Sequence, residues 1–142
     1  MTMLSQLLDT KGHRVQFIAP GASVLDAIRQ MAENHIGALM VMEEGRLLGV
    51  LSERDYARKV VLMNRASDST QVREIMSSPV VTIGAHGTVD DAMRLMTERR
   101  IRHLPVLRGE AVIGVVSIGD LVKSVLQEQQ HTINDLRSYI QG

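Results

Sequence analysis

The sequence predicts an α/β (α+β) protein built from two copies of one β-α-β-β-α unit. The stretches "GVLSERD" at 49–55 and "GVVSIGD" at 114–120 are nearly alike and lie 65 positions apart. At this offset, residues 18–55 align with 83–120 without a gap, and 14 of the 38 pairs are identical. In both copies, short β-branched runs alternate with segments of helical periodicity. A fixed internal repeat of this kind indicates one supersecondary unit used twice.

Length and composition suit such an arrangement. The chain has 142 residues, of which 44% are hydrophobic and 23% charged, as in an ordinary globular protein. It is long enough for one compact domain or for two half-sized units that share a core. The predicted divisions are a first repeat with its N-terminal segment (1–63), a linker (64–78), a second repeat (79–127) and a C-terminal helical tail (128–142).

Each repeat is expected to begin with a short strand and a helix. The β-branched runs at 15–18 and 80–83 predict the strands. Ser23 and Thr88 are suitable N-caps for the helices that follow. In the helix at 24–35, and in its copy, apolar residues recur at spacings of three and four, so that one face packs and the other is charged.

A hairpin and a second helix are expected to complete each repeat. Tight turns at Glu44-Gly45 and at Gly109 separate the strand pairs, which are 38–43 with 47–52 and 104–108 with 111–117. Ser52 and Ser117 then begin the second helices, 53–63 and 118–130.

The segments outside the repeats carry weaker signals. The linker is polar and leads to Pro79, with Ile75 and Met76 as its expected anchors. In the tail, Ile133, Leu136 and Ile140 share one side of a helix. That side suits packing either on the tail's own domain or on a partner subunit.

Several classes of partner are disfavoured. The 16 basic and 16 acidic residues cancel without forming blocks, and Trp is absent, so nucleic-acid binding is not expected. No apolar stretch approaches the roughly 20 residues that span a bilayer, so no membrane role is expected. The N-terminal segment lacks the features of a signal peptide, and a cytoplasmic location is the default expectation.

The sequence also lacks the usual signs of an enzyme. Catalysis needs a nucleophile, a paired acid and base, or a metal within hydrogen-bonding reach. The chain has no cysteine, its five histidines show no recurrent metal-ligand spacing, and neither a phosphate-binding loop motif nor a dinucleotide-binding fingerprint is present. We therefore predict no catalytic residues, no metal ligands and no enzymatic activity.

The duplication, the stretch "IRHLPVL" at 101–107 and the two Gly-apolar-apolar-Ser-x-x-Asp corners resemble the tandem cystathionine-β-synthase (CBS) domain pair, or Bateman module. The stretches "SERDYARKV" and "LRSYIQG" are similar to those of small stand-alone CBS-pair proteins. The resemblance implies two repeats packed about a pseudo-twofold axis, with clefts that bind adenosine-containing ligands. These are AMP, ADP, ATP or NAD(H), and less readily S-adenosylmethionine. It also implies a homodimer.

The corners have chemistry that suits a nucleotide. A strand that turns into a helix at Ser leaves backbone N–H groups unpaired and a partial positive charge. The carboxylates of Asp55 and Asp120 offer two acceptor oxygens each, which match the two hydroxyls of a ribose. The same residues at the same spacing also form capping boxes with Ser52 and Ser117, and the sequence alone leaves both interpretations open. The resemblance adds the ligand-binding role.

The resemblance also implies that Arg102 and His103 reach the phosphates, where Arg could bind bidentately. Gly37 and Ala38 stand at the matching places of the first repeat, so the two clefts should differ. Arg54 and Arg58 are candidates to compensate, although charges on a helix face more often sit in water. The expected cleft lining is Val80, Ile101, Pro105 and Val115 for the second site, and Val15, Ile36, Gly37, Met40 and Val50 for the first.

Two functions follow from these observations. The first is a regulatory adenine-nucleotide-binding module, for energy or redox sensing, whose state is read by a regulated protein partner or by the dimer interface. The alternative is a constitutive interaction or dimerisation module that has no small-molecule ligand.

Overall fold

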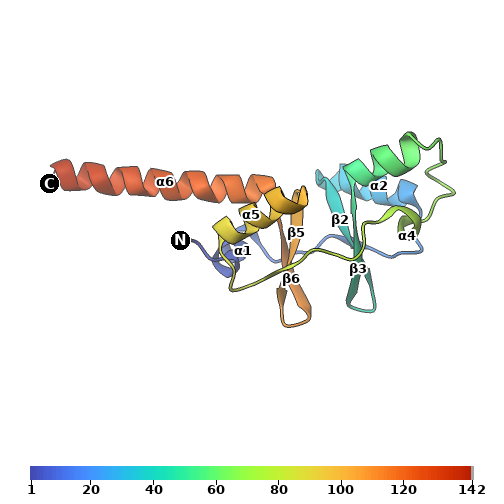
Figure 1. Ribbon diagram of the computed structural model, residues 1–142, viewed down its shortest axis with the longest axis horizontal. Helices are drawn as coiled ribbons and strands as arrows, with labels where there is room; N and C mark the ends of the chain where they lie inside the picture. The colour runs from blue at the N-terminus through green and yellow to red at the C-terminus, as the bar shows by residue number, and fades with distance from the viewer. Residues whose placement is uncertain (142) are drawn as a thin grey trace. The chain divides into compact units, whose positions relative to one another are not determined.

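The computed structural model describes residues 1–141 and divides the chain into two compact units (Figure 1). The repeat-1 unit is Val15–Val81, and the repeat-2 unit joins Met1–Arg14 to the chain from Thr82 onward. Each unit has one three-stranded sheet with helices packed against it. The predicted mixed α and β fold, made from two equivalent repeats, is confirmed.

The repeat-1 unit has sheet order β1-β2-β3, in which β1 runs parallel to β2 and β2 forms an antiparallel hairpin with β3. The hairpin turns at Glu44 and Gly45, which both have positive φ. The elements are β1 (Phe17–Ile18), α2 (Val24–Asn34), β2 (Ala38–Glu43), β3 (Arg46–Ser52), α3 (Glu53–Tyr56), the π-helical turn η1 (Ala57–Val61) and α4 (Val72–Ile75).

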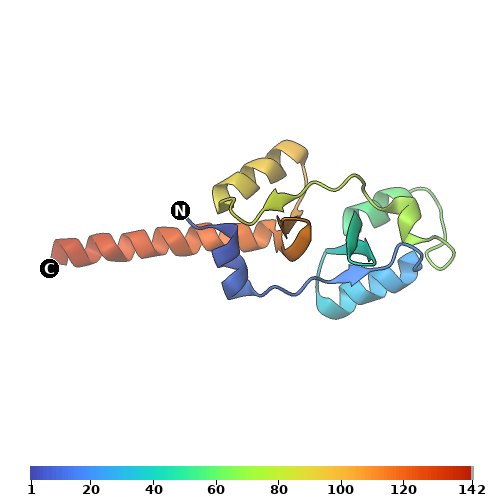
Figure 2. The same cartoon turned by 90° about the horizontal axis from the view of Figure 1, so that it is seen from below.

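The repeat-2 unit has the same connectivity, with sheet order β4-β5-β6. A helix from the start of the chain joins it and lies against the sheet (Figure 2). The elements are α1 (Leu4–Lys11), β4 (Ile83–Gly84), α5 (Val89–Arg99), β5 (His103–Arg108), β6 (Ala111–Ser117) and α6 (Ile118–Gln141).

The first helix of each repeat has the N-cap and the buried apolar face that the sequence predicts. The side chains of Ser23 and Thr88 accept hydrogen bonds from backbone N–H groups at the third helical position, both at 3.1 Å. The apolar stripes are buried against the sheets, and they consist of Val24, Ala27 and Met31 in α2 and Val89, Ala92 and Met96 in α5. Both helices end at equivalent residues in the left-handed conformation, His35 and Arg100.

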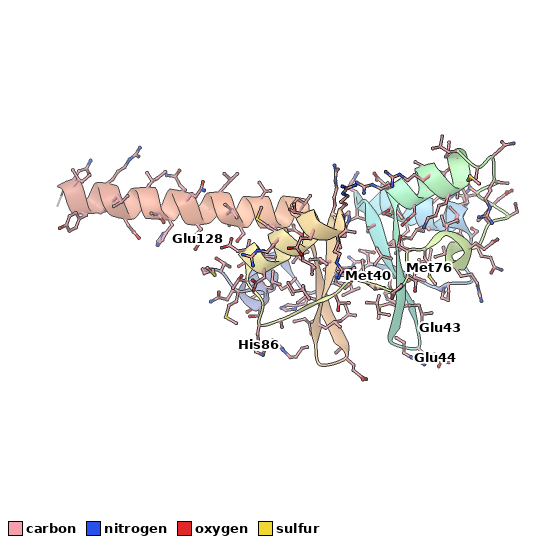
Figure 3. The ribbon with its side chains drawn as sticks, in the orientation of Figure 1. Met40, Glu43, Glu44, Met76, His86 and Glu128 are labelled. Atoms are coloured by element: carbon pink, nitrogen blue, oxygen red, sulfur yellow. The ribbon has the colours of Figure 1, made fainter. Side chains whose placement is uncertain are left out.

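Short helices that the sequence reading missed pack on the hairpins. α1 precedes the first repeat but packs on β6, while α4 lies in the predicted linker and packs on β3. The expected anchor Ile75 is buried, and Met76, labelled in Figure 3, packs beside it. The predicted divisions follow the repeats along the chain, whereas each compact unit takes its leading helix from the segment before the other repeat.

The second helices differ between repeats. In the first, the predicted helix 53–63 is split into α3 and η1 and is followed by Asn64 in the left-handed conformation. In the second, α6 runs for 24 residues, so the predicted tail continues the same helix. Ile133, Leu136 and Ile140 are exposed, and packing of the tail on its own domain is therefore wrong. Within residues 1–141, no helix combines the length and the apolar character needed to cross a bilayer.

Candidate functional site

The second-repeat corner is formed where β6 meets α6. Ser117, the last residue of β6, lies directly opposite His103 in the hairpin register. The backbone N–H of Ile118 donates to the carbonyl of Arg102 at 2.9 Å. These two contacts hold the start of β5 against the start of α6. The structure thus brings the backbones of Arg102, His103 and Ser117 together, with Asp120 in the first turn of the helix.

The carboxylate of Asp120 is held from two directions. Its Oδ2 accepts from the backbone N–H of Ser117 at 2.8 Å, and the Ser117 hydroxyl accepts from the backbone N–H of Asp120 at 3.1 Å, which completes a capping box. Lys11, at the end of α1, places Nζ 2.5 Å from the same Oδ2 and 2.5 Å from the carbonyl of Val115. The Asp120 side chain remains 25% exposed.

The protonation of Asp120 follows from these contacts. Partial burial by itself raises the pKa of this carboxyl. Hydrogen bonds from Lys11 and Ser117, together with the positive charge of Lys11, outweigh burial and leave the pKa below its usual value. Asp120 is therefore an anion near neutral pH and a ready hydrogen-bond acceptor.

The first-repeat corner has the same backbone. Ser52 lies opposite Ala38, and the N–H of Glu53 donates to the carbonyl of Gly37 at 3.0 Å. Asp55, however, is 10% exposed and accepts at both oxygens. Its Oδ2 accepts from the Ser52 N–H at 2.9 Å and hydroxyl at 3.0 Å, and its Oδ1 accepts from the Ser77 hydroxyl at 3.0 Å and from Lys59 Nζ at 3.1 Å.

The two corners are therefore closed in different ways. Val50 exchanges both backbone hydrogen bonds with Ser77, whereas the equivalent Val115 accepts at its carbonyl from the Lys11 side chain. A backbone bridge and a serine hydroxyl lie against Asp55, and a long lysine side chain lies against Asp120. The lysine can leave by side-chain rotation alone, but the Ser77 bridge is part of the backbone.

The structure brings some of the predicted cleft-lining residues together. In the hairpin registers Met40 lies opposite Val50, and Pro105 lies opposite Val115. Ile36 and Ile101 follow helices α2 and α5 and are half-buried. Val15 and Val80 both fall in the repeat-1 unit, so Val80 belongs to a different unit from the three residues with which the sequence analysis grouped it.

The expected basic residues lie near the corners. Arg102 is exposed beside its corner, and His103 is half-buried within β5. In the first repeat, Arg54 is exposed on α3, next to Asp55 in the sequence, and Arg58 is exposed on η1.

The sequence analysis missed three residues that hold the corners: Lys11, Lys59 and Ser77. Lys59 stands four positions after Asp55, a spacing typical of ion pairs on one helical face, and this signal was available. Lys11 is 109 positions from Asp120, and no local pattern could pair the two residues.

A cavity also lies away from the second-repeat corner. A cavity of about 340 Å³ lies at the opposite end of the β5–β6 hairpin, between 82–86 and 107–109. Within residues 1–141, no group of three or more His, Asp or Glu side chains is placed to hold a metal ion.

Comparison with known proteins identifies the fold. The CBS domain model matches residues 10–62 and 72–127. The chain is 37% identical to the CBS domain-containing protein CBSX3, mitochondrial, of Arabidopsis thaliana, over 99% of this chain and 73% of that protein. It is 30% identical to the CBS domain-containing protein YhcV of Bacillus subtilis, over 89% of each.

A solved structure agrees with the sequence comparisons. A protein with CBS domains from Burkholderia ambifaria is 46% identical, with a TM-score of 0.87 over 90% of this chain and 96% of the other. The family model covers both repeats, each of which folds into the same three-stranded unit. The chain therefore belongs to the CBS domain family and carries a CBS-domain pair, a type of module that is generally regulatory.

Proposed function

We propose that this protein is a regulatory module that binds an adenine nucleotide at its second-repeat corner without chemical turnover. The observation that carries the proposal is the difference between the two corner carboxylates. Asp120 remains partly exposed and is held by one lysine side chain, while Asp55 is buried and accepts at both oxygens. AMP, ADP, ATP and NAD(H) all carry the ribose and phosphates that this corner suits.

The corner has hydrogen-bonding groups for the ribose and for the phosphates of such a ligand. The anionic carboxylate of Asp120 accepts from the two ribose hydroxyls. Arg102 and His103 lie beside it and supply positive charge or N–H donors for the phosphates. The half-buried Val115 offers apolar surface for the base, and the buried Pro105 lies opposite it in the hairpin. Ribose binding requires Lys11 to release Asp120, and the released ammonium is then available to the phosphates.

The first corner is proposed as a weaker site. A ligand there would have to replace the hydrogen bonds of Asp55 to Ser77 and Lys59. Gly37, which stands at the place of Arg102, supplies no charge. The basic residue nearest to Asp55 in the sequence is Arg54. We therefore propose that the first nucleotide enters at Asp120 and that Ser52 and Asp55 bind at higher concentration.

The experiment is a thermal-unfolding screen with AMP, ADP, ATP, NAD, NADH and S-adenosylmethionine. A ligand at about 100 times its Kd stabilises the folded state by about 2.7 kcal/mol, which raises Tm by several degrees for a domain of this size. Asp120→Asn should abolish most of that rise. Asp91→Asn is the matched control, because Asp91 forms the same capping box with Thr88 away from the corner.

A second variant tests the role of Lys11. Lys11→Met removes the group that competes with the ribose, and Arg14→Met is a control in the same segment. Adenosine, which has no phosphates, should bind up to about fivefold more tightly to Lys11→Met, since a partly exposed ion pair contributes up to about 1 kcal/mol. Unchanged or weaker adenosine binding would contradict the proposed competition.

The alternative is a constitutive interaction module, and the exposed apolar side chains on α6 are the observation in its favour. It is supported if none of the six ligands raises Tm. A product formed from any of these nucleotides, and lost in Asp120→Asn, would instead show an enzyme. A regulated protein partner and a cytoplasmic location remain part of the proposal. One of the similar proteins is named as mitochondrial.

A further inference from the structure

The long helix α6 carries an exposed apolar stripe. Among its described residues, Leu121 is the one that is buried, in the first turns against α5 and β6. Glu128, labelled in Figure 3, forms an ion pair with the N-terminal ammonium of Met1. In Figures 1 and 2 the rest of the helix runs out beyond the sheet of its unit. We define the α6 seam as Val122, Leu126, Gln129, Ile133, Leu136 and Ile140.

The seam has the spacing of a coiled coil. Its members are separated by four, three, four, three and four residues, which is the alternation of the a and d positions of a seven-residue repeat. In that register Leu126, Ile133 and Ile140 are at a, and Val122, Gln129 and Leu136 are at d. A single amphipathic helix packed on a globular core usually shows a wider apolar stripe. This narrow seam instead fits one partner helix.

We propose that the α6 seam packs against the same seam of a second copy of this chain, as a parallel two-stranded coiled coil. The residue types favour this arrangement. In the outer part of the seam, β-branched Ile133 and Ile140 at a with Leu136 at d favour two parallel strands, whereas Leu126 at a and Val122 at d do not follow this pattern. In register, Gln129 meets its own counterpart, so the two side-chain amides can hydrogen-bond to each other. A register that is shifted by one heptad would set each Gln129 against an apolar residue and break this pair, so the amides favour the in-register arrangement.

The exposed area is sufficient for such a dimer. The apolar members of the seam and the adjacent Tyr139 are between 42% and 87% exposed. With about 200 Å² for a fully exposed large side chain, they present about 700 Å² per copy. Two copies would then bury about 1,400 Å², within the range of about 1,200–2,000 Å² for stable interfaces. The helix from Val122 to Ile140 is about 28 Å long.

The antiparallel alternative is less favourable. An antiparallel pair that fills every layer of the seam sets Gln129 against Ile133 of the other copy, and the amide then loses its partner in an apolar layer. It also brings Lys123 towards Arg137 of the other copy, because both residues flank the seam on the same side. In the parallel arrangement Arg137 faces Thr132 of the other copy, and Lys123 lies 14 residues, about 21 Å along the helix axis, from Arg137, so these two like charges do not meet.

An isolated outer helix would also be marginal. In water, helices of this length owe most of their stability to packing of an apolar face. The seam has no such packing within its own chain. The inference does not depend on nucleotide binding, so a failed ligand screen leaves it standing and the reverse also holds.

Disulfide trapping tests the arrangement directly, because the chain has no cysteine of its own. Gln129→Cys places one thiol within the seam, and Ser138→Cys, the matched control, places one on the opposite side of the helix. Mild oxidation should convert Gln129→Cys to a covalent dimer and leave Ser138→Cys monomeric on a non-reducing gel. Failure of Gln129→Cys to cross-link, or equal cross-linking of both variants, would overturn the parallel seam.

Sedimentation of the full chain tests whether the seam holds the dimer. The wild-type protein and Asn134→Lys, a control on an exposed face, should sediment as dimers at micromolar concentration. Ile133→Lys should sediment as a monomer, with a lower helical signal in circular dichroism. Because Ile133 is exposed in the single chain, this variant should still fold, and a cooperative unfolding transition in urea would show it. A monomeric wild type, or a dimer that survives Ile133→Lys, would overturn the proposal.

Discussion

Asp55 and Asp120 occupy equivalent positions of the duplicated corner, yet their surroundings differ. Each carboxylate accepts from the backbone N–H of the serine three positions earlier, so both keep the capping interaction. Asp55 adds Ser77 and Lys59 within its own unit and is buried. The same residue type is therefore nearly enclosed by hydrogen-bond partners in the first repeat and partly exposed in the second.

This difference predicts unequal costs of substitution. Asp55→Ala removes the cap and also the acceptor of the Ser77 hydroxyl and of the Lys59 ammonium, and it should lower the free energy of unfolding by about 2–4 kcal/mol. Asp120→Ala should lower it by about 1 kcal/mol, the usual value of a lost cap. Urea denaturation of both variants measures the two values. Equal losses would mean that Asp55 contributes no more to the stability of the fold than Asp120 does.

The depressed pKa of Asp120 sets a limit at acid pH. Its folded-state pKa lies below the ordinary value, so its contribution to stability is present above pH of about 4 and is lost as pH falls through the lower folded value. Nucleotide binding that uses the carboxylate should likewise persist through neutral pH.

At the scale of elements, the leading helices explain the glycine of each corner. A Cβ added at Gly114 would lie 2.6 Å from Leu8 Cδ2, and one added at Gly49 would lie 2.6 Å from Met76 Sδ. The strands can accept the leading segments this closely because these positions carry no side chain. The repeated Gly is thus a packing requirement as well as part of a motif.

Gly114→Ala should therefore loosen α1 on β6. Leu8 is fully buried and has little room to move, so overpacking should lower the free energy of unfolding by about 1–3 kcal/mol. Gly84→Ala is the control, because a Cβ there meets nothing within 4 Å. Urea denaturation compares the two variants. A loss for Gly84→Ala as large as that for Gly114→Ala would exclude this explanation.

The segment after α1 is also held by a titratable group. His13 contacts Asp9 Oδ1 through Nε2 at 2.9 Å and the Ile113 carbonyl through Nδ1 at 2.8 Å. Hydrogen bonds to Asp9 and Ile113 raise the pKa of His13, against smaller opposing effects of burial and of Arg108. The imidazolium can donate at both nitrogens, which the neutral ring cannot.

The attachment of this segment should therefore weaken as pH rises. A raised folded-state pKa means that the stabilisation is fully present below pH of about 6.5 and is lost as pH rises through the folded value. Titration of the His13 ring protons by NMR should give a pKa above the ordinary value of about 6.5. Amide exchange in α1 should become pH-independent in His13→Gln once the intrinsic exchange rate is corrected. A His13 pKa at or below about 6.5 would refute the assignment.

On the scale of the whole molecule, the segment that precedes each repeat in the sequence belongs to the compact unit of the other repeat. Residues 1–14 complete the unit of the second repeat, and residues 64–81 complete that of the first. Each unit therefore depends on chain far from its own repeat. Lys11 is part of residues 1–14. The packing of this segment on the second repeat therefore also places the Lys11 ammonium next to Asp120.

The sequence by itself determined the duplicated β-α-β-β-α order, the caps Ser23 and Thr88, the hairpin turns and the corner residues. These features depend on local periodicity and on residue types at short spacing, and the 65-residue offset shows them twice. The tertiary structure alone decided that α1 joins the second repeat, that Lys11 pairs with Asp120 and that Ser77 closes over Asp55. It also decided that the outer part of α6 lies exposed. Such contacts join residues up to 109 positions apart, and no local pattern encodes which distant segment fills an open sheet face.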